Sequence, residues 1–159
     1  VNLATAVVAS LVIGLFQEQI ETVVALAVLM PIVASMGGNA GTQTLTVAVR
    51  ALAVKELTAR NALYIIGKEV VVGGVNGMIF AVLTGAIAYF WFGDILIGLV
   101  IGLAMIINMF VAGLAGILVP IGLDRANIDP AVASSVILTT ITDVVGFFCF
   151  LGLAALVLL

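Results

Sequence analysis

One carboxylate in an otherwise apolar stretch is the residue of this sequence best suited to chemistry. Asp143 lies among aliphatic, hydroxyl and glycine residues, in the run Val136-Ile-Leu-Thr-Thr-Ile-Thr-Asp143-Val-Val-Gly146. An ionisable side chain inside a membrane is costly, and it usually faces a bundle interior or a water-filled path. A structural ion pair is the alternative, but Asp143 lies roughly 20 Å along its helix at ~1.5 Å per residue. The basic residues cluster near helix ends, so we interpret Asp143 as functional.

Hydroxyl side chains share the helix face of Asp143. Ser135 and Thr139 precede it at intervals of four residues, which places all three on one stripe. Hydroxyl and carboxylate oxygens suit Mg²⁺, Ca²⁺ and Mn²⁺ better than softer metals. Taken without Asp143, the hydroxyl groups are better explained by hydrogen bonds to the carbonyl one turn back.

A second polar stripe lies early in the chain. It contains amide, hydroxyl and basic side chains at helical spacing, with Thr42 beside it: Ser35, Asn39, Gln43, Thr46 and Arg50. Such a helix is poorly suited to lipid and is expected to face protein or water. For the amides, interhelical hydrogen bonding and pore lining are equally good interpretations. Interhelical bonds are the preferred interpretation for Asn76 and Asn108.

The composition indicates what must position these residues. Of 159 residues, 65% are hydrophobic and 8% are charged, and this excess of apolar surface cannot be hidden in a soluble domain. The net charge of −3 includes no basic cluster, so nucleic acid is not expected as a partner. The absence of histidine and the single cysteine argue against zinc or iron–sulfur chemistry.

The predicted fold class is an all-α integral membrane protein with five transmembrane helices. The expected spans are residues 1–16, 22–54, 62–92, 95–119 and 129–158, with Asp129 as N-cap and Pro130 at the first helical position of the last one. Glycine pairs four residues apart, such as Gly73 and Gly77, are expected to allow close helix packing. The first run is short for a span of about 20 residues, so we expect the chain to be one domain of a longer protein.

Basic residues predict the orientation in a cell membrane. All five flank the second and fourth connections, which the positive-inside rule places in the cytoplasm, with the N-terminus inside and the C-terminus outside. Lys68 and Glu69 near the inner edge are interpreted as snorkelling side chains or an interfacial ion pair.

The coordination chemistry of Mg²⁺ favours a dimer. Mg²⁺ takes six oxygens and releases water reluctantly, so one aspartate cannot strip it. Two symmetry-related Asp143 carboxylates in a homodimer could hold a largely hydrated ion on the dimer axis.

Two motifs resemble those of a known family. Pro31-Ile-Val-Ala-Ser-Met-Gly-Gly-Asn-Ala-Gly-Thr-Gln43 with Val49-Arg-Ala-Leu52 resembles the second membrane helix of MgtE-type magnesium channels. Asp129-Pro-Ala-Val-Ala-Ser and Thr139-Thr-Ile-Thr-Asp143-Val-Val-Gly146 resemble the fifth.

The resemblance implies a homodimeric channel with a pore lined by helices 2 and 5. It implies Asp143 as the main ion-selecting residue, with water retained on the ion and with oxygens from Thr139 and Ser135. Thr42 matches another pore-lining position, and Asn39 on the same helix is a further candidate. Cytoplasmic regulatory domains, including paired CBS domains, accompany this membrane domain in the family and lie outside the chain.

Three functions are therefore weighed. The first is a channel domain passing Mg²⁺ across the membrane, with Mn²⁺ and Co²⁺ as further candidate ions. The alternative is a proton- or Na⁺-coupled secondary transporter with Asp143 as the coupling carboxylate. A non-conducting anchor would need one helix rather than five, and enzyme activity is not expected because no nucleophile has a base beside it in the pattern.

Overall fold

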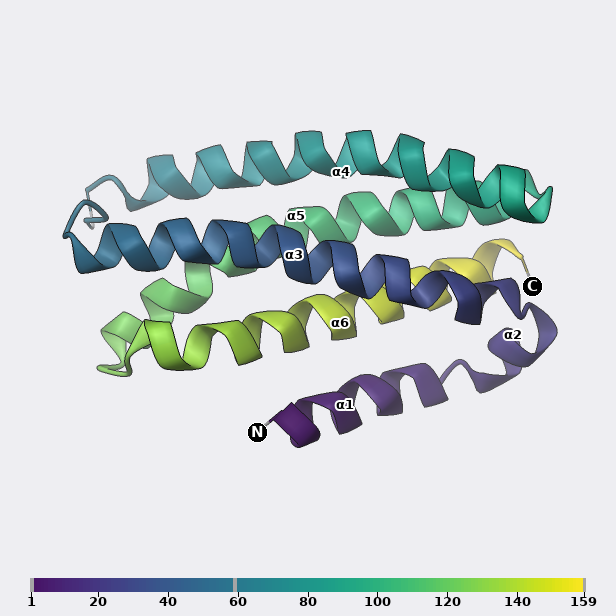
Figure 1. Ribbon diagram of the computed structural model, residues 1–159, viewed down its shortest axis with the longest axis horizontal. Coiled ribbons are helices and arrows are strands. Elements are labelled where there is room, and N and C mark those ends of the chain that lie inside the picture. Colours follow the sequence, from purple (N-terminus) through teal and green to yellow (C-terminus); the bar gives the residue numbers. More distant parts are fainter. Residues whose placement is uncertain (1, 59, 159) are drawn as a thin grey trace.

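The computed structural model describes residues 2–58 and 60–158, and these residues form helices joined by short turns (Figure 1). In chain order the elements are α1 (Asn2–Gly14), α2 (Gln17–Thr22), α3 (Ala25–Ala53), α4 (Ala62–Phe92), α5 (Ile95–Arg125) and α6 (Pro130–Val157). No strand occurs in these ranges. The all-α prediction is therefore confirmed for the described residues.

Four of these helices, α3 to α6, are long and apolar enough to cross a membrane. The chain is thus a membrane protein of several apolar helices. Helix α1 is apolar but has 13 residues, a length of about 20 Å against a hydrocarbon core of about 30 Å. In Figure 1 it begins midway along the bundle and runs to the end at which α2 turns the chain into α3.

Local sequence signals fix several helix ends. The Asp129 carboxylate accepts a hydrogen bond from the Ala131 backbone N–H at 2.9 Å, so it caps α6 as predicted, and Pro130 follows. Asp94 caps α5 in the same way. Gly93, with φ of 69°, ends α4 in the left-handed conformation that glycine adopts without strain.

One predicted helix end is wrong. The fourth span was expected to end at residue 119, before Pro120, yet α5 continues through Pro120 to Arg125. Proline removes one backbone donor but keeps a helical φ angle, so a helix supported by its neighbours can pass through it. Pro120 is buried among those neighbours, which supply that support.

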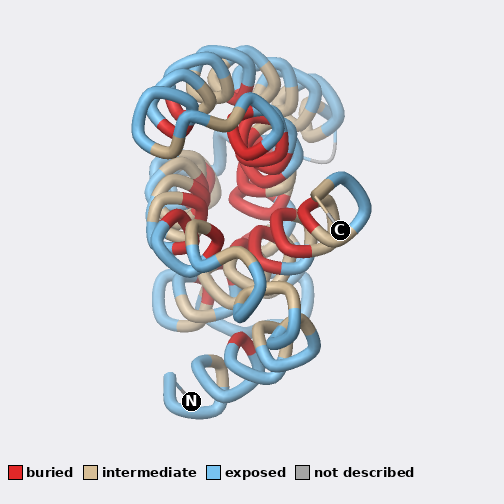
Figure 2. The backbone as a smooth tube through the Cα atoms, turned by 90° about the vertical axis from the view of Figure 1, so that its right-hand side faces the viewer, coloured by how far each residue is buried: buried red, intermediate tan, exposed pale blue. Residues whose placement is uncertain are grey.

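Helix α5 lies at the centre of the bundle. It packs against α3, α4 and α6, while α3 also packs against α6 and α1 packs mainly on α6. Consecutive long helices run in opposite directions (Figure 1). Figure 2 shows the buried positions gathered in the middle of the bundle, whereas α1 is exposed along most of its length, with Ala9 its one buried residue.

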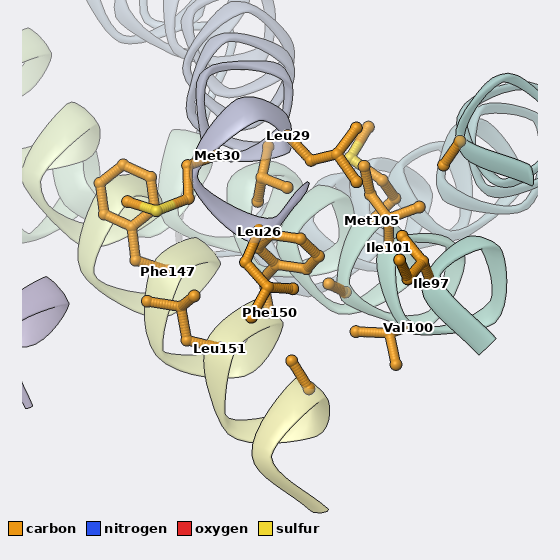
Figure 3. Packing of buried hydrophobic residues seen from close by; sticks show 14 of the residues in the cluster. Leu26, Leu29, Met30, Ile97, Val100, Ile101, Met105, Phe147, Phe150 and Leu151 are labelled. Carbon is orange, nitrogen blue, oxygen red and sulfur yellow. The ribbon is translucent and has the colours of Figure 1, made fainter. Parts of the chain in front are cut away.

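The larger core fills the end of the bundle near the start of α3 and α5 (Figure 3). Large side chains from three helices meet there: Leu26, Leu29 and Met30 of α3, Val100, Ile101 and Met105 of α5, and Phe147, Phe150 and Leu151 of α6. A smaller cluster of Leu45, Ala115 and Leu138 joins the same three helices further along. Both clusters hold α3 and α6 against α5.

Glycines bring helix backbones into contact, as their spacing predicted. A Cβ on Gly98 would lie 2.7 Å from the carbonyl oxygen of Gly85, so α4 and α5 touch there through their main chains. A Cβ on Gly73 would lie 3.0 Å from the carbonyl oxygen of Met109. These contacts explain why α4 follows α5 closely along its length.

Candidate functional site

The polar stripe of α3 faces away from the core of the chain. Ser35, Asn39 and Thr42 are exposed, whereas Gly37 and Gly41 on the opposite face are buried. The helix therefore buries its small and aliphatic residues against α5 and α6 and leaves its polar side uncovered by its own chain. In a membrane such a polar face requires protein or water beside it.

The polar stripe of α6 lies at the edge of the packed face. Ser135 is exposed, and Thr139 and Asp143 are half-buried. Ser134, Leu138 and Thr142 are buried on the neighbouring face. The predicted site residues of α6 thus share one face, and Asp143 sits where that face meets the core.

Asn108 of α5 brings α3 and α6 together near Asp143. Its side chain lies against Gly37 of α3, and a Cβ on Gly146 of α6 would lie 2.7 Å from its amide nitrogen. The same amide donates a hydrogen bond to the Val33 carbonyl at 2.9 Å. The prediction of an interhelical bond by Asn108 is confirmed.

The candidate residues of α3 and α6 therefore lie at a similar depth. On α3, Asn39 lies between Gly37 and Gly41. Gly37 and Gly146 of α6 both contact the Asn108 side chain, and a Cβ on Gly41 would lie 2.9 Å from the Leu138 side chain of α6. Asp143 lies between Leu138 and Gly146 on α6. Because Gly37 pairs with Gly146 and Gly41 pairs with Leu138, the residues between them, Asn39 and Asp143, lie at a similar level of the bundle.

The hydroxyl groups bond to their own helices. Thr42 Oγ1 donates to the Gly38 carbonyl at 2.7 Å, and Thr139 Oγ1 donates to the Ser135 carbonyl at 3.0 Å. Each hydroxyl proton is thereby directed into the helix, and the oxygen lone pairs remain for an ion or its water. The backbone bonding expected of these hydroxyls is confirmed, and it is compatible with a ligand role.

Asp143 is the only carboxylate on this surface of the described chain. Over residues 2–58 and 60–158, no three histidine, cysteine, aspartate or glutamate side chains come together to hold a metal ion. A single chain thus offers one anionic ligand accompanied by neutral oxygens. That set suits a cation that keeps most of its water, and a second carboxylate would have to come from another molecule.

The sequence did not predict one polar contact of α4. The sequence suggests that Lys68 and Glu69 are snorkelling side chains or an interfacial ion pair. In the structure, Glu69 Oε2 accepts a hydrogen bond from Thr44 Oγ1 of α3 at 3.1 Å. Glu69 is half-buried, whereas Lys68 is exposed. The sequence does hold a signal for such a contact, because Glu69 is a carboxylate inside an apolar run, as Asp143 is.

Comparisons with known proteins agree with the sequence motifs. The profile of the MgtE family, described as a divalent cation transporter, matches residues 30–153, a stretch that includes all five candidate site residues. The chain is 34% identical over 154 residues to the magnesium transporter MgtE of Thermus thermophilus, covering 97% of this chain and 34% of that protein.

Two further relatives carry the same name. The magnesium transporter MgtE of Bacillus subtilis is 32% identical over 143 residues, which are 90% of this chain and 32% of that protein. The protein of that name from Enterococcus faecalis is 37% identical over 131 residues, which are 82% of this chain and 29% of that protein. The chain thus spans about a third of the length of the curated relatives it matches.

Proposed function

Because this chain belongs to the MgtE family of divalent cation transporters, we propose that it forms the membrane part of a homodimeric, magnesium-selective channel. The observation that carries the proposal is Asp143, a half-buried carboxylate near the middle of an apolar helix. Ser135 and Thr139 share its face of α6, and Asn39 of α3 lies at a similar level of the bundle. The names of the relatives specify magnesium as the ion. Mn²⁺ and Co²⁺ are further candidates.

The ion would be held with its water. Two Asp143 carboxylates, one from each subunit, would face the hydrated cation across the dimer axis. Thr139 and Ser135 would supply oxygens one and two turns away on α6, and Asn39 and Thr42 would line the pore from α3. The outward direction of these polar faces supports this arrangement, because pairing two chains would enclose them.

The membrane arrangement is part of the proposal. We place five crossings in each subunit, with α1 as the first, of which the described residues cover about 20 Å. The positive-inside rule supports an N-terminal side in the cytoplasm and a C-terminus outside. Labelling from outside with an impermeant thiol reagent tests this: Glu18→Cys should react and Asp124→Cys should not, both in a Cys149→Ala background.

Flux into liposomes tests the channel. Wild-type chain should pass Mg²⁺ down its gradient without a proton or Na⁺ gradient, and Mg²⁺ should raise its thermal stability. Asp143→Asn removes the charge at constant size, so flux should fall by at least about tenfold and the stabilisation should be lost. If both proteins respond alike to Mg²⁺, the ion site lies elsewhere.

The same experiment separates the channel from a coupled carrier. A carrier that uses Asp143 as the coupling carboxylate would move protons or Na⁺ together with the divalent ion. Acidification, alkalinisation or Na⁺ movement in fixed ratio to Mg²⁺ uptake would favour that alternative. We also propose that cytoplasmic regulatory domains accompany this domain in the full-length protein, since the relatives are about three times as long.

A further inference from the structure

A small polar cavity lies between α3, α4 and α5. Its volume is about 140 Å³, and no residue of α6 lines it. Four oxygen-bearing side chains reach its wall: Gln43 and Thr44 from α3, and Glu69 and Asn76 from α4. We call it the Glu69 cavity. It is therefore separate from the Asp143 surface described above.

Backbone contacts fix the shape of the Glu69 cavity. A Cβ on Gly73 would lie 3.0 Å from the Met109 carbonyl oxygen, and a Cβ on Gly113 would lie 3.0 Å from the Glu69 carbonyl oxygen. Helices α4 and α5 thus touch along one wall and leave the space on the α3 side. Glycines that allow this approach make the cavity part of the packed structure rather than a gap between loose helices.

The carboxylate of Glu69 is only partly satisfied. Thr44 Oγ1 donates to its Oε2 at 3.1 Å across the α3–α4 contact. Lys68 is its neighbour in sequence, but adjacent residues of a helix do not face each other, and Lys68 is exposed. Glu69 lies about 10 Å into α4, at ~1.5 Å per residue, and among the described residues it is the one charged side chain that lines the cavity.

We propose that the Glu69 cavity binds a second divalent cation through Glu69 and several retained waters. At ~30 Å³ per water, the volume of about 140 Å³ has room for about four to five waters. Mg²⁺ is commonly held by one or two carboxylates while it keeps several waters, and the oxygens of Thr44, Gln43 and Asn76 would bind those waters. The charge, the volume and the oxygen ligands all fit this mode of binding.

The cavity adjoins the polar face of α3. Gln43 lines it and is also exposed, one helical turn after Asn39. A cation in the Glu69 cavity would thus lie beside the surface proposed to line the pore, displaced toward the end of the bundle that holds the basic residues. The choice of ion rests on the proposed function, whereas binding can be measured without conduction.

Mn²⁺ binding in an Asp143→Asn background isolates the second site. The purified full chain in detergent is titrated with Mn²⁺, and free Mn²⁺ is followed by electron paramagnetic resonance. The Asp143→Asn chain should still bind Mn²⁺. Adding Glu69→Gln should weaken that binding by at least about tenfold, because the charged ligand is lost while an oxygen remains for the Thr44 hydroxyl. Asn76→Leu, which fills the cavity, should do the same.

Glu56→Gln is the matched control, because Glu56 is an exposed carboxylate outside the cavity. In the Asp143→Asn background it should leave Mn²⁺ binding unchanged, and circular dichroism verifies that every variant is folded. Failure of the Asp143→Asn chain to bind Mn²⁺, or equal binding with and without Glu69→Gln, would overturn the proposal. If Asp143→Asn alters neither flux nor binding but Glu69→Gln does, the proposed function fails while the second site stands.

Discussion

Asn108 is the residue that sets the distance between the helices carrying the polar faces. Its side chain is fully buried, donates to the Val33 carbonyl at 2.9 Å, and occupies the space left by two glycines, Gly37 and Gly146. Because protein interiors are closely packed, any atom added here must displace either the amide or a helix. The position of Asp143, one turn before Gly146, depends on this arrangement.

Gly146→Ala should destabilise the chain through this contact. The new Cβ would lie 2.7 Å from Asn108 Nδ2 and 3.1 Å from Val33 Cγ1, and overpacking of this kind typically costs ~1–3 kcal/mol. Thermal unfolding in one detergent, compared with wild type, measures the loss. Combining Gly146→Ala with Asn108→Ala should cost less than the sum of the two single changes, since the clash is removed.

Gly74→Ala is the control for that experiment. Gly74 lies in α4 with no atom near its would-be Cβ, so alanine should be neutral or should stabilise by up to about 1 kcal/mol. Equal losses at Gly74 and Gly146 would contradict the assigned role of Asn108.

At the residue level, the sequence identifies isolated polar groups but not their partners. Asp143 and Asn108 are recognisable because each interrupts an apolar helix. That Asn108 meets Val33 and that Glu69 meets Thr44 depends on which helices are neighbours and how they are rotated. Periodicity gives the face of a helix but not the helix that covers it.

Among the elements, α6 depends on a well-defined start. Asp129 accepts from the Ala131 N–H and Pro130 follows it, so the first turn of α6 forms with one of its free donors satisfied. This start sets the register of every later residue of the helix, including Thr139 and Asp143.

Asp129→Ala should weaken the start of α6. Loss of the cap is expected to cost ~0.5–2 kcal/mol, whereas Asp129→Asn keeps a capping oxygen and should cost little. Thermal unfolding of the two variants beside wild type makes the comparison. Equal losses for the two variants would mean that the charge of Asp129, and not its capping oxygen, matters.

Helix types were easier to predict than helix ends. Long apolar runs identify α3 to α6, and the Asp129-Pro130 pair marks the start of α6 correctly. The end of α5 was missed because Pro120 is a stop signal only where no neighbours support the helix. The polar stretch after residue 16 was expected to be a connection, and it forms the short helix α2.

On the scale of the molecule, the surface of one chain is incomplete. Polar residues of α3 and α6 are exposed in a chain whose remaining surface is largely aliphatic. No periodicity in one sequence can say whether water, lipid or a second chain covers such a face. Homodimerisation therefore remains a prediction that rests on the chemistry of Asp143 and on this uncovered face.

Cross-linking tests the dimer directly. In a Cys149→Ala background, Asn39→Cys should be joined to its symmetry mate by a short bifunctional thiol reagent, because Asn39 is proposed to line a pore on the dimer axis. Val82, which is 72% exposed on α4, provides the control as Val82→Cys. Linked dimers should dominate for the first variant on a denaturing gel. Equal linking at both positions would indicate random collision.

Pro120 has a consequence for how the bundle moves. Because Pro120 has no N–H, the Gly116 carbonyl lacks its usual helical donor. The segment up to Arg125 is therefore joined to the rest of α5 by one backbone hydrogen bond fewer. Helix α5, at the centre of the bundle, thus has a break in its backbone hydrogen bonding near the end that the positive-inside rule predicts to be cytoplasmic. Amide protons of α5 beyond Pro120 should therefore exchange with deuterium sooner than those before it.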